Sequence, residues 1–180
     1  MFSSLWLAIP LVVGNTWHLI MPFVGWRTFG FKNSISENAT RSKGILFIHR
    51  TVHIGLAFCF LVYSSFLWTQ SFHVAAILLI VAALFDTAQV LKLSSRTNHT
   101  PLYLRDKHQF LAWSMALFYL LFSIVFAVEK QLPINVLVGF VLSLGGVLII
   151  SFVTNQRYFW FAQMAFFVST STVMAVSAVL

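Results

Sequence analysis

The sequence predicts an all-α, polytopic integral membrane protein built as a bundle of six transmembrane helices. Three observations lead to this prediction. Of the 180 residues, 59% are hydrophobic and only 8% are charged, whereas about 25% of the residues of a soluble domain are charged. Six apolar segments are each close to the roughly 20 residues that cross a hydrocarbon core. Ten of the eleven Lys and Arg residues fall on one side of the stack that these segments would form.

The six segments follow one another along the whole chain. Their approximate ranges are 4–24, 45–68, 71–92, 108–128, 134–153 and 158–180. Two connections, 25–44 and 93–107, are long and polar, and the other three are short. Short connections make neighbouring helices antiparallel, and no segment outside the bundle is long enough to bury a second core. We therefore expect a single transmembrane helical domain over residues 1–180.

The basic residues predict the orientation of the bundle. Alternation places the connections 25–44, 93–107 and 154–157 on one side, and every Lys and Arg except Lys130 belongs to that side. Because cytoplasmic loops carry an excess of Lys and Arg, both termini are expected outside, N-out and C-out, in the inner membrane of a bacterial cell. The same bias explains the net charge of +7. We therefore expect the lipid bilayer as the partner of the basic residues, and no nucleic acid.

Titratable side chains of the first three segments fall at a similar depth. At about 1.5 Å of rise per residue, His18 and Asp86 each lie about 9 Å from the inner end of their helix. His49 and His53 lie at about 6 and 12 Å on the second segment, and their i, i+4 spacing places them on one face. The sequence therefore predicts a His/Asp polar layer near the cytoplasmic face.

Our leading interpretation of this layer is a small multi-pass transporter or channel that binds or conducts a proton, an ion or a small solute. Ionisable residues inside a membrane usually face the bundle interior and mark such paths. Asp86 would supply the charge, and His18 and His53 would titrate or ligate beside it. Asn15 and Gln89 lie three residues from His18 and Asp86 on the same helix faces. Together with His49, they would orient these side chains.

An alternative interpretation is a membrane redox enzyme or subunit that binds a divalent metal or haem b. Imidazole and carboxylate groups suit such ions, although an HxxxH spacing without the Glu of HExxH is a weak signal. Haem b would take one of the pairs His53 and His108 or His18 and His53 as its ligands. The candidate metal ligands are His18, His49, His53, Asp86 and His108.

A second alternative is a non-catalytic membrane assembly subunit. In that case the polar residues only join helices through hydrogen bonds, each worth about 0.6–2 kcal/mol in a membrane. The partners would be further copies of the chain, as a homo-oligomer, or other membrane subunits. The sequence contains no nucleotide-binding loop and no nucleophile elbow. It therefore assigns no catalytic residue and leaves open whether the chain is an enzyme.

Overall fold

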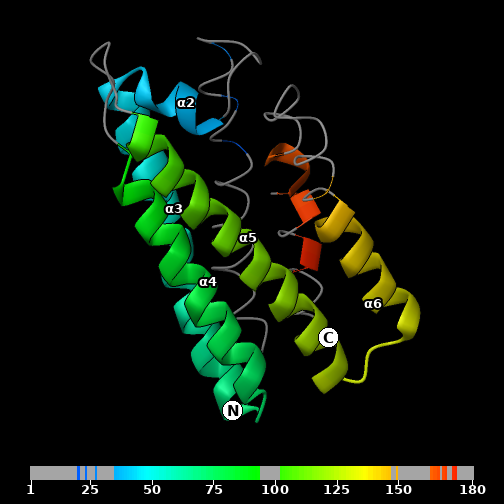
Figure 1. Ribbon diagram of the computed structural model, residues 1–180. Helices are drawn as coiled ribbons and strands as arrows, with labels where there is room; N and C mark the ends of the chain where they lie inside the picture. The colour runs from blue at the N-terminus through cyan, green and yellow to red at the C-terminus, as the bar shows by residue number, and fades with distance from the viewer. Residues whose placement is uncertain are drawn as a thin grey trace.

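The computed structural model describes residues 35–93, 102–146 and 149, together with positions 20, 23, 27, 163–166, 168–169 and 172–173. Every regular element in this described part of the chain is a helix. The long helices are α3 (Lys43–Thr69), α4 (His73–Leu91) and α5 (Leu102–Glu129) (Figure 1). The all-α prediction is therefore confirmed for the described residues.

Three described helices are long and apolar enough to cross a membrane. These candidate spans are Lys43–Thr69, His73–Leu91 and Lys107–Glu129, with 27, 19 and 23 residues. At about 1.5 Å per residue even the shortest span reaches about 28 Å, which is close to the thickness of a hydrocarbon core. They correspond to the second, third and fourth predicted segments, which are confirmed as apolar helices.

The long helices form an antiparallel arrangement with α4 in the middle, in contact with both α3 and α5 (Figure 1). Two shorter helical pieces complete the described fold. α2 (Ile35–Thr40) lies across the end at which α3 begins. α6 (Ile134–Phe140) packs on α5 and continues directly as the π-helical segment η1 (Val141–Gly145).

Several predicted boundaries differ from the structure. The connection 25–44 contains α2, whose residues are mostly buried, and α5 begins at Leu102, more than one turn before the predicted start at His108. Hydropathy marks only the apolar part of a helix, so it misses polar turns that extend beyond that part. The predicted fifth helix changes to i→i+5 hydrogen bonding within η1, a geometry that hydropathy does not reveal. Most residues of the first and sixth predicted segments lie outside the described residues.

The connection between α3 and α4 is a tight turn with a left-handed residue. Ser71 has a φ of 67°, its N–H donates to Trp68 O at 3.1 Å, and the N–H of Phe72 donates to Leu67 O at 3.0 Å. This pair of bonds is a Schellman motif, which satisfies carbonyl groups at a helix end. It turns the chain back within a few residues, so α4 must run antiparallel to α3.

The connection between α5 and α6 repeats this geometry. Gln131 has a φ of 56° and donates its N–H to Val128 O at 3.0 Å, while Leu132 donates to Ala127 O at 2.8 Å. Neither turn has the glycine that usually occupies the left-handed position. Both turns therefore hold an L side chain in a conformation that costs about 1–2 kcal/mol.

Polar contacts join these two turns at the same end of the bundle. Oε2 of Glu129, the last residue of α5, accepts a hydrogen bond of 3.3 Å from the N–H of Ala75 in the first turn of α4. A carboxylate at this position interacts favourably with the positive end of the helix dipole. Nζ of Lys130 lies 5.5 Å from the ring centre of Phe72. The Glu129–Lys130 pair therefore has a structural role at the end opposite α2.

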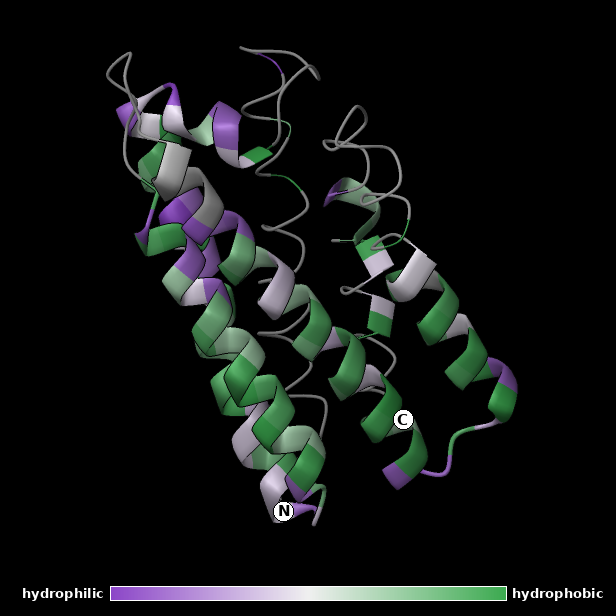
Figure 2. Ribbon diagram, in the orientation of Figure 1, coloured by the Kyte–Doolittle hydropathy of each residue, from purple (hydrophilic) through white to green (hydrophobic). Residues whose placement is uncertain are grey.

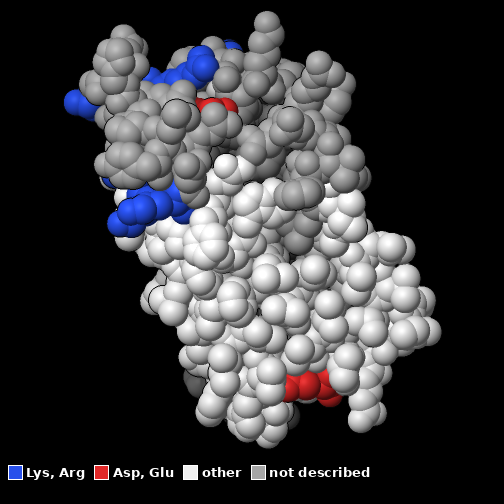
Figure 3. Space-filling model, viewed as in Figure 1, with Lys and Arg blue, Asp and Glu red and all other residues white. Residues whose placement is uncertain are grey.

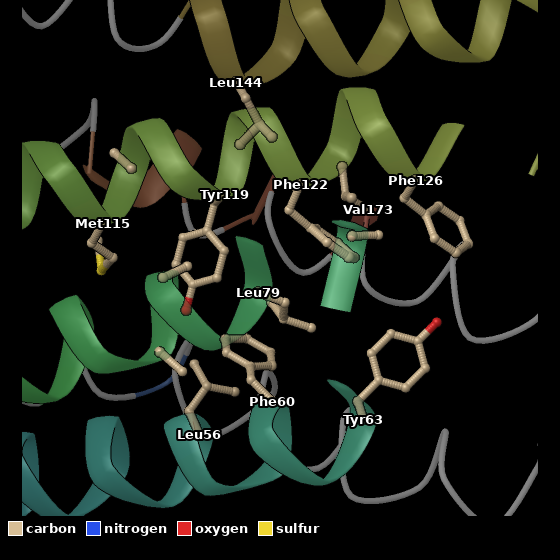
Figure 4. Close-up of a cluster of buried hydrophobic side chains, with 14 of the residues drawn as sticks. Leu56, Phe60, Tyr63, Leu79, Met115, Tyr119, Phe122, Phe126, Leu144 and Val173 are labelled. Atoms are coloured by element: carbon tan, nitrogen blue, oxygen red, sulfur yellow. The ribbon is translucent and has the colours of Figure 1, made fainter. Parts of the chain in front are cut away.

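The core is built from aromatic rings of α3 and α5 that pack over small residues of α4. Phe60 and Tyr119 meet edge to face with their ring centres 5.4 Å apart, and Figure 4 shows Phe122 and Phe126 continuing this packing along α5. α4 contributes the buried residues Ala75, Ala76, Leu79, Ala82 and Ala83. Small residues let helices approach closely, which is how helices associate when lipid surrounds them.

The outer surface of the bundle is apolar along the length of the long helices. Large hydrophobic side chains are exposed there, including Phe47 at 71% and Phe110 at 68%. Figure 2 shows hydrophobic residues along the middle of α3 to α6 and hydrophilic residues toward the α2 end. Figure 3 shows that Lys and Arg gather at the α2 end. An apolar surface of this extent is unfavourable in water and suits a bilayer.

Candidate functional site

His53 of α3 and Asp86 of α4 face each other inside the bundle. Nδ1 of His53 lies 2.7 Å from Oδ1 of Asp86, and each side chain is only 1% exposed. The two residues meet because they lie at similar distances from the short turn that joins their antiparallel helices. The distance is that of a charge-assisted hydrogen bond. This pair is the centre of the candidate site.

Gln89 is the second partner of Asp86. Its Nε2 donates to the same Oδ1 at 2.9 Å, because residues three apart on a helix share a face. The same nitrogen lies 3.7 Å from Sδ of Met115 on α5. The two N–H bonds of the amide can therefore serve one acceptor each. Gln89 fixes the carboxylate of Asp86 and connects it to α5.

His49 extends the site along α3 by one helical turn toward α2. Its ring centre lies 4.5 Å from that of His53, with an angle of 68° between the ring planes. Both rings are buried, with 1% exposure each. The N-terminus of α3 lies at the α2 end of the bundle. A row of titratable groups therefore leads toward that end, in the order Asp86, His53 and His49.

His108 approaches the site from α5. Its Nδ1 lies 3.0 Å from the main-chain oxygen of Gln89, so Gln89 is held at both its backbone and its side chain. His108 also interacts electrostatically with His53 and with Glu37 of α2. It lies within α5 and not at its start, in contrast to the predicted helix boundary. Three long helices and α2 thus contribute charged or titratable groups to one region.

α2 covers the end of the bundle beside this region with polar residues. Ser36, Asn38 and Thr40 are buried, and Thr40 Oγ1 donates to Glu37 O at 2.8 Å. The N–H of Ile35 donates to Oε1 of Gln163 at 2.8 Å, which ties the start of α2 to a residue far along the chain. The α2 residues belong to the stretch 25–44, whose polar sequence predicts a connection.

Arg50 has a role that the sequence analysis did not assign. Its Nε donates to Val90 O at 3.3 Å, and its Nη2 also donates to Leu93 O. A cation at the negative end of a helix is favourable, so Arg50 caps the C-terminus of α4. The available signal was a lone arginine in the second turn of α3, opposite the end of its antiparallel neighbour.

Tyr119 of α5 is the second residue that sequence reasoning missed. It is 3% exposed, packs against Phe60, and interacts electrostatically with Asp86. It lies one turn from Met115, on the same helix face. A tyrosine within the mostly apolar stretch of α5 was the signal that could have identified it.

Three hydroxyl groups inside the long helices bond within their own helix and do not belong to the site. Ser64, Thr87 and Ser123 each donate to the main-chain oxygen four residues earlier, at 2.7, 3.0 and 2.7 Å. Such bonds satisfy the hydroxyl within its own helix. The polar contacts between α3, α4 and α5 near Asp86 are therefore distinct from the ordinary packing of serine and threonine.

The structure brings together five of the residues that the sequence analysis named and leaves two unplaced. The residues brought together are His49, His53, Asp86, Gln89 and His108. Asn15 and His18 lie outside the described residues. Among the residues that the structure describes, no group of three or more His, Cys, Asp or Glu side chains is arranged to hold a metal ion. The metal and haem interpretations therefore gain no support from the described geometry.

The arrangement suits the binding of a proton. The two side chains together carry one negative charge when Asp86 is ionised and His53 is neutral. They carry no net charge when they hold one more proton. A low-dielectric interior disfavours net charge, so exchange of this proton changes the electrostatic state of the whole site. The hydrogen bond to Asp86 also orients the imidazole ring and selects the Nδ1–H tautomer of a neutral His53.

No protein-family model, curated protein or solved structure matches this chain.

Proposed function

We propose that this chain is a multi-pass membrane protein that passes protons through the buried pair His53 and Asp86. The observation that carries the proposal is their 2.7 Å contact at 1% exposure, within helices able to span a membrane. An isolated carboxylate at such a depth costs about 2.5 kcal/mol or more. If this residue only joined helices through hydrogen bonds, an uncharged amide such as Asn would do so at a lower free-energy cost than Asp86.

The proposed topology has six spans within one domain of residues 1–180, with both termini outside. Charge asymmetry supports it: among the described residues, Lys43, Lys92 and Lys107 lie at the α2 end and Lys130 at the opposite end. By the positive-inside rule the α2 end then faces the cytoplasm, in the inner membrane of a bacterial cell. The polar site would lie on the cytoplasmic side of the bilayer centre.

The proposed proton path runs from the cytoplasmic end through His49 to His53 and Asp86. His49 and His53 are in ring contact, and an imidazole ring can accept a proton at one nitrogen and release one from the other. The groups facing this path come from every neighbouring helix. They are Glu37 of α2, His49, Arg50 and His53 of α3, Asp86 and Gln89 of α4, and His108 and Tyr119 of α5.

The proposal is tested by proton flux into liposomes that contain the purified full-length protein. A potassium gradient with valinomycin supplies the driving force, and a pH-sensitive dye inside the liposomes reports the flux. We expect flux above that of protein-free liposomes for the wild type, and the protein-free rate for Asp86→Asn. For His53→Gln, which keeps a hydrogen-bond donor but cannot titrate, we expect a loss of at least about a hundredfold.

Matched controls make the same chemical changes at the opposite end. Glu129→Gln removes a carboxylate yet leaves an oxygen that can accept from Ala75, and His73→Gln changes an exposed histidine. Both should retain wild-type flux. Wild-type flux equal to that of protein-free liposomes would refute the proposal. If folded Asp86→Asn protein conducts normally and only its yield falls, Asp86 serves helix packing instead.

A further inference from the structure

The hydroxyl group of Tyr119 is buried in an unusual way. The side chain is 3% exposed, and its hydroxyl has no hydrogen-bond partner among the residues that the structure describes. Buried tyrosine hydroxyls usually have a partner, because leaving one unpaired costs about 1–3 kcal/mol. The rest of the side chain is well packed: its ring centre lies 5.4 Å from that of Phe60 and 6.2 Å from that of Phe166.

The position of Tyr119 relates this hydroxyl to the candidate site. Met115, four residues earlier on α5, contacts the amide of Gln89, which in turn holds Asp86. Tyr119 itself interacts electrostatically with Asp86. Figure 4 shows the ring extending from α5 with its hydroxyl directed toward α3 and α4. The hydroxyl therefore lies on the same side of α5 as the carboxylate.

We infer that Tyr119 is a positioning residue of the proton site, and that its hydroxyl holds a bound water molecule against the carboxylate of Asp86. This inference rests on the proposed function and adds a residue and a ligand to it. A buried water normally makes two to four hydrogen bonds to polar groups. The hydroxyl of Tyr119 supplies one partner, and a carboxylate, which can accept several hydrogen bonds, supplies another. The water donates to Asp86 when the carboxylate is ionised, and thereby stabilises the state that has released its proton.

Infrared difference spectroscopy on the full-length protein in lipid, recorded between two pH values, tests this inference. The chain has only four Asp and Glu residues, so Asp86→Asn identifies the carboxyl band of Asp86. If that variant does not fold, ¹³C-labelled aspartate narrows the assignment to Asp86 and Asp106. Tyr119→Phe keeps both ring contacts, and we expect it to shift the Asp86 band. It should also remove a water O–H band, identified in the wild type by its shift in H₂¹⁸O.

Tyr63→Phe is the matched control, because Tyr63 is an equally buried tyrosine of the same core. It should leave both bands unchanged. An unchanged Asp86 band in Tyr119→Phe would overturn the inference, and so would the lack of any water band that this variant removes. A purely structural role of the ring, which the substitution preserves, could produce neither of the two expected changes.

Proton flux separates the failure of this inference from that of the proposed function. We expect Tyr119→Phe to lower flux about ten- to a hundredfold, the factor that a hydrogen bond to a charged group typically contributes. A wild-type protein without flux but with the expected spectral changes would refute proton transport and leave the water site standing. Normal wild-type flux that Tyr119→Phe does not alter would refute the positioning role alone.

Discussion

Arg50 caps α4 through Val90: its Nε donates to the main-chain oxygen of Val90 at 3.3 Å. This contact joins α3 to the end of α4 a short distance beyond Gln89 and Asp86. α4 ends at Leu91, at the α2 end of the bundle (Figure 1), which is where Lys and Arg gather (Figure 3). Arg50 therefore has a structural function at the border of the candidate site and holds the helix end that carries it.

Replacement of Arg50 should destabilise the bundle. Arg50→Gln removes the charge and part of the donor set at the α4 C-terminus, so we expect the free energy of unfolding to fall by about 1–2 kcal/mol. Denaturant titration in detergent micelles measures this change. Lys43→Gln, at an exposed position of the same end, should change stability by less than about 0.5 kcal/mol. Equal effects of the two variants would argue against the capping role.

Asp86 and Gln89 should be energetically coupled. Both residues lie on α4, and a double-mutant cycle with Asp86→Asn and Gln89→Leu is expected to give a coupling energy of about 0.5–3 kcal/mol, the range for residues of one hydrogen-bond network. Met115→Leu preserves volume and removes only a weak acceptor, and we expect a loss of less than about 1.5 kcal/mol. A coupling energy near zero would mean that the 2.9 Å contact between Gln89 and Asp86 contributes nothing to stability.

The two left-handed turn residues should be improved by glycine. Ser71→Gly and Gln131→Gly place glycine where φ is 67° and 56°, and each should raise the free energy of unfolding by up to about 1 kcal/mol. Gln70→Gly serves as control, since its φ of −91° is ordinary for any residue and glycine should lower stability there. Stabilisation by Gln70→Gly and not by Ser71→Gly would contradict the turn geometry.

Chelation of metals distinguishes the proton site from the metal and haem alternatives. In our account Nδ1 of His53 is engaged by Asp86, so proton flux should not change after treatment with a strong chelator. The purified protein should show no Soret band and no stoichiometric metal on elemental analysis. A tightly bound metal whose removal abolishes flux would favour the alternative with ligands among His18, His49, His53, Asp86 and His108.

Much of the helical framework could be predicted from the sequence, because burial in lipid requires long apolar runs. The predicted segments 45–68 and 71–92 differ from α3 and α4 by at most a few residues. Depth counting also placed His53 and Asp86 in one layer, because both lie in helices joined by a short turn. These inferences depend only on length and hydropathy, which are local properties of the chain.

Contacts that depend on helix rotation could not be predicted in the same way. Counting residues gives the depth of a side chain in the membrane but not the neighbouring helix that it faces. The sequence therefore predicts neither the cap made by Arg50 nor the position of Tyr119. α2 escaped prediction because its polar sequence resembles a loop, and its buried positions depend on contacts with distant residues such as Gln163. The π-helical segment η1 likewise has no hydropathy signature.

The most direct measurement is ¹⁵N NMR of the histidine rings in lipid as a function of pH, with His53 assigned by His53→Gln. If His53 and Asp86 bind one proton as a coupled pair, the His53 resonances should follow a titration that moves when Asp86→Asn is introduced and stays in place in Glu129→Gln. A His53 ring whose spectrum and titration are identical in the wild type and in Asp86→Asn would contradict the account.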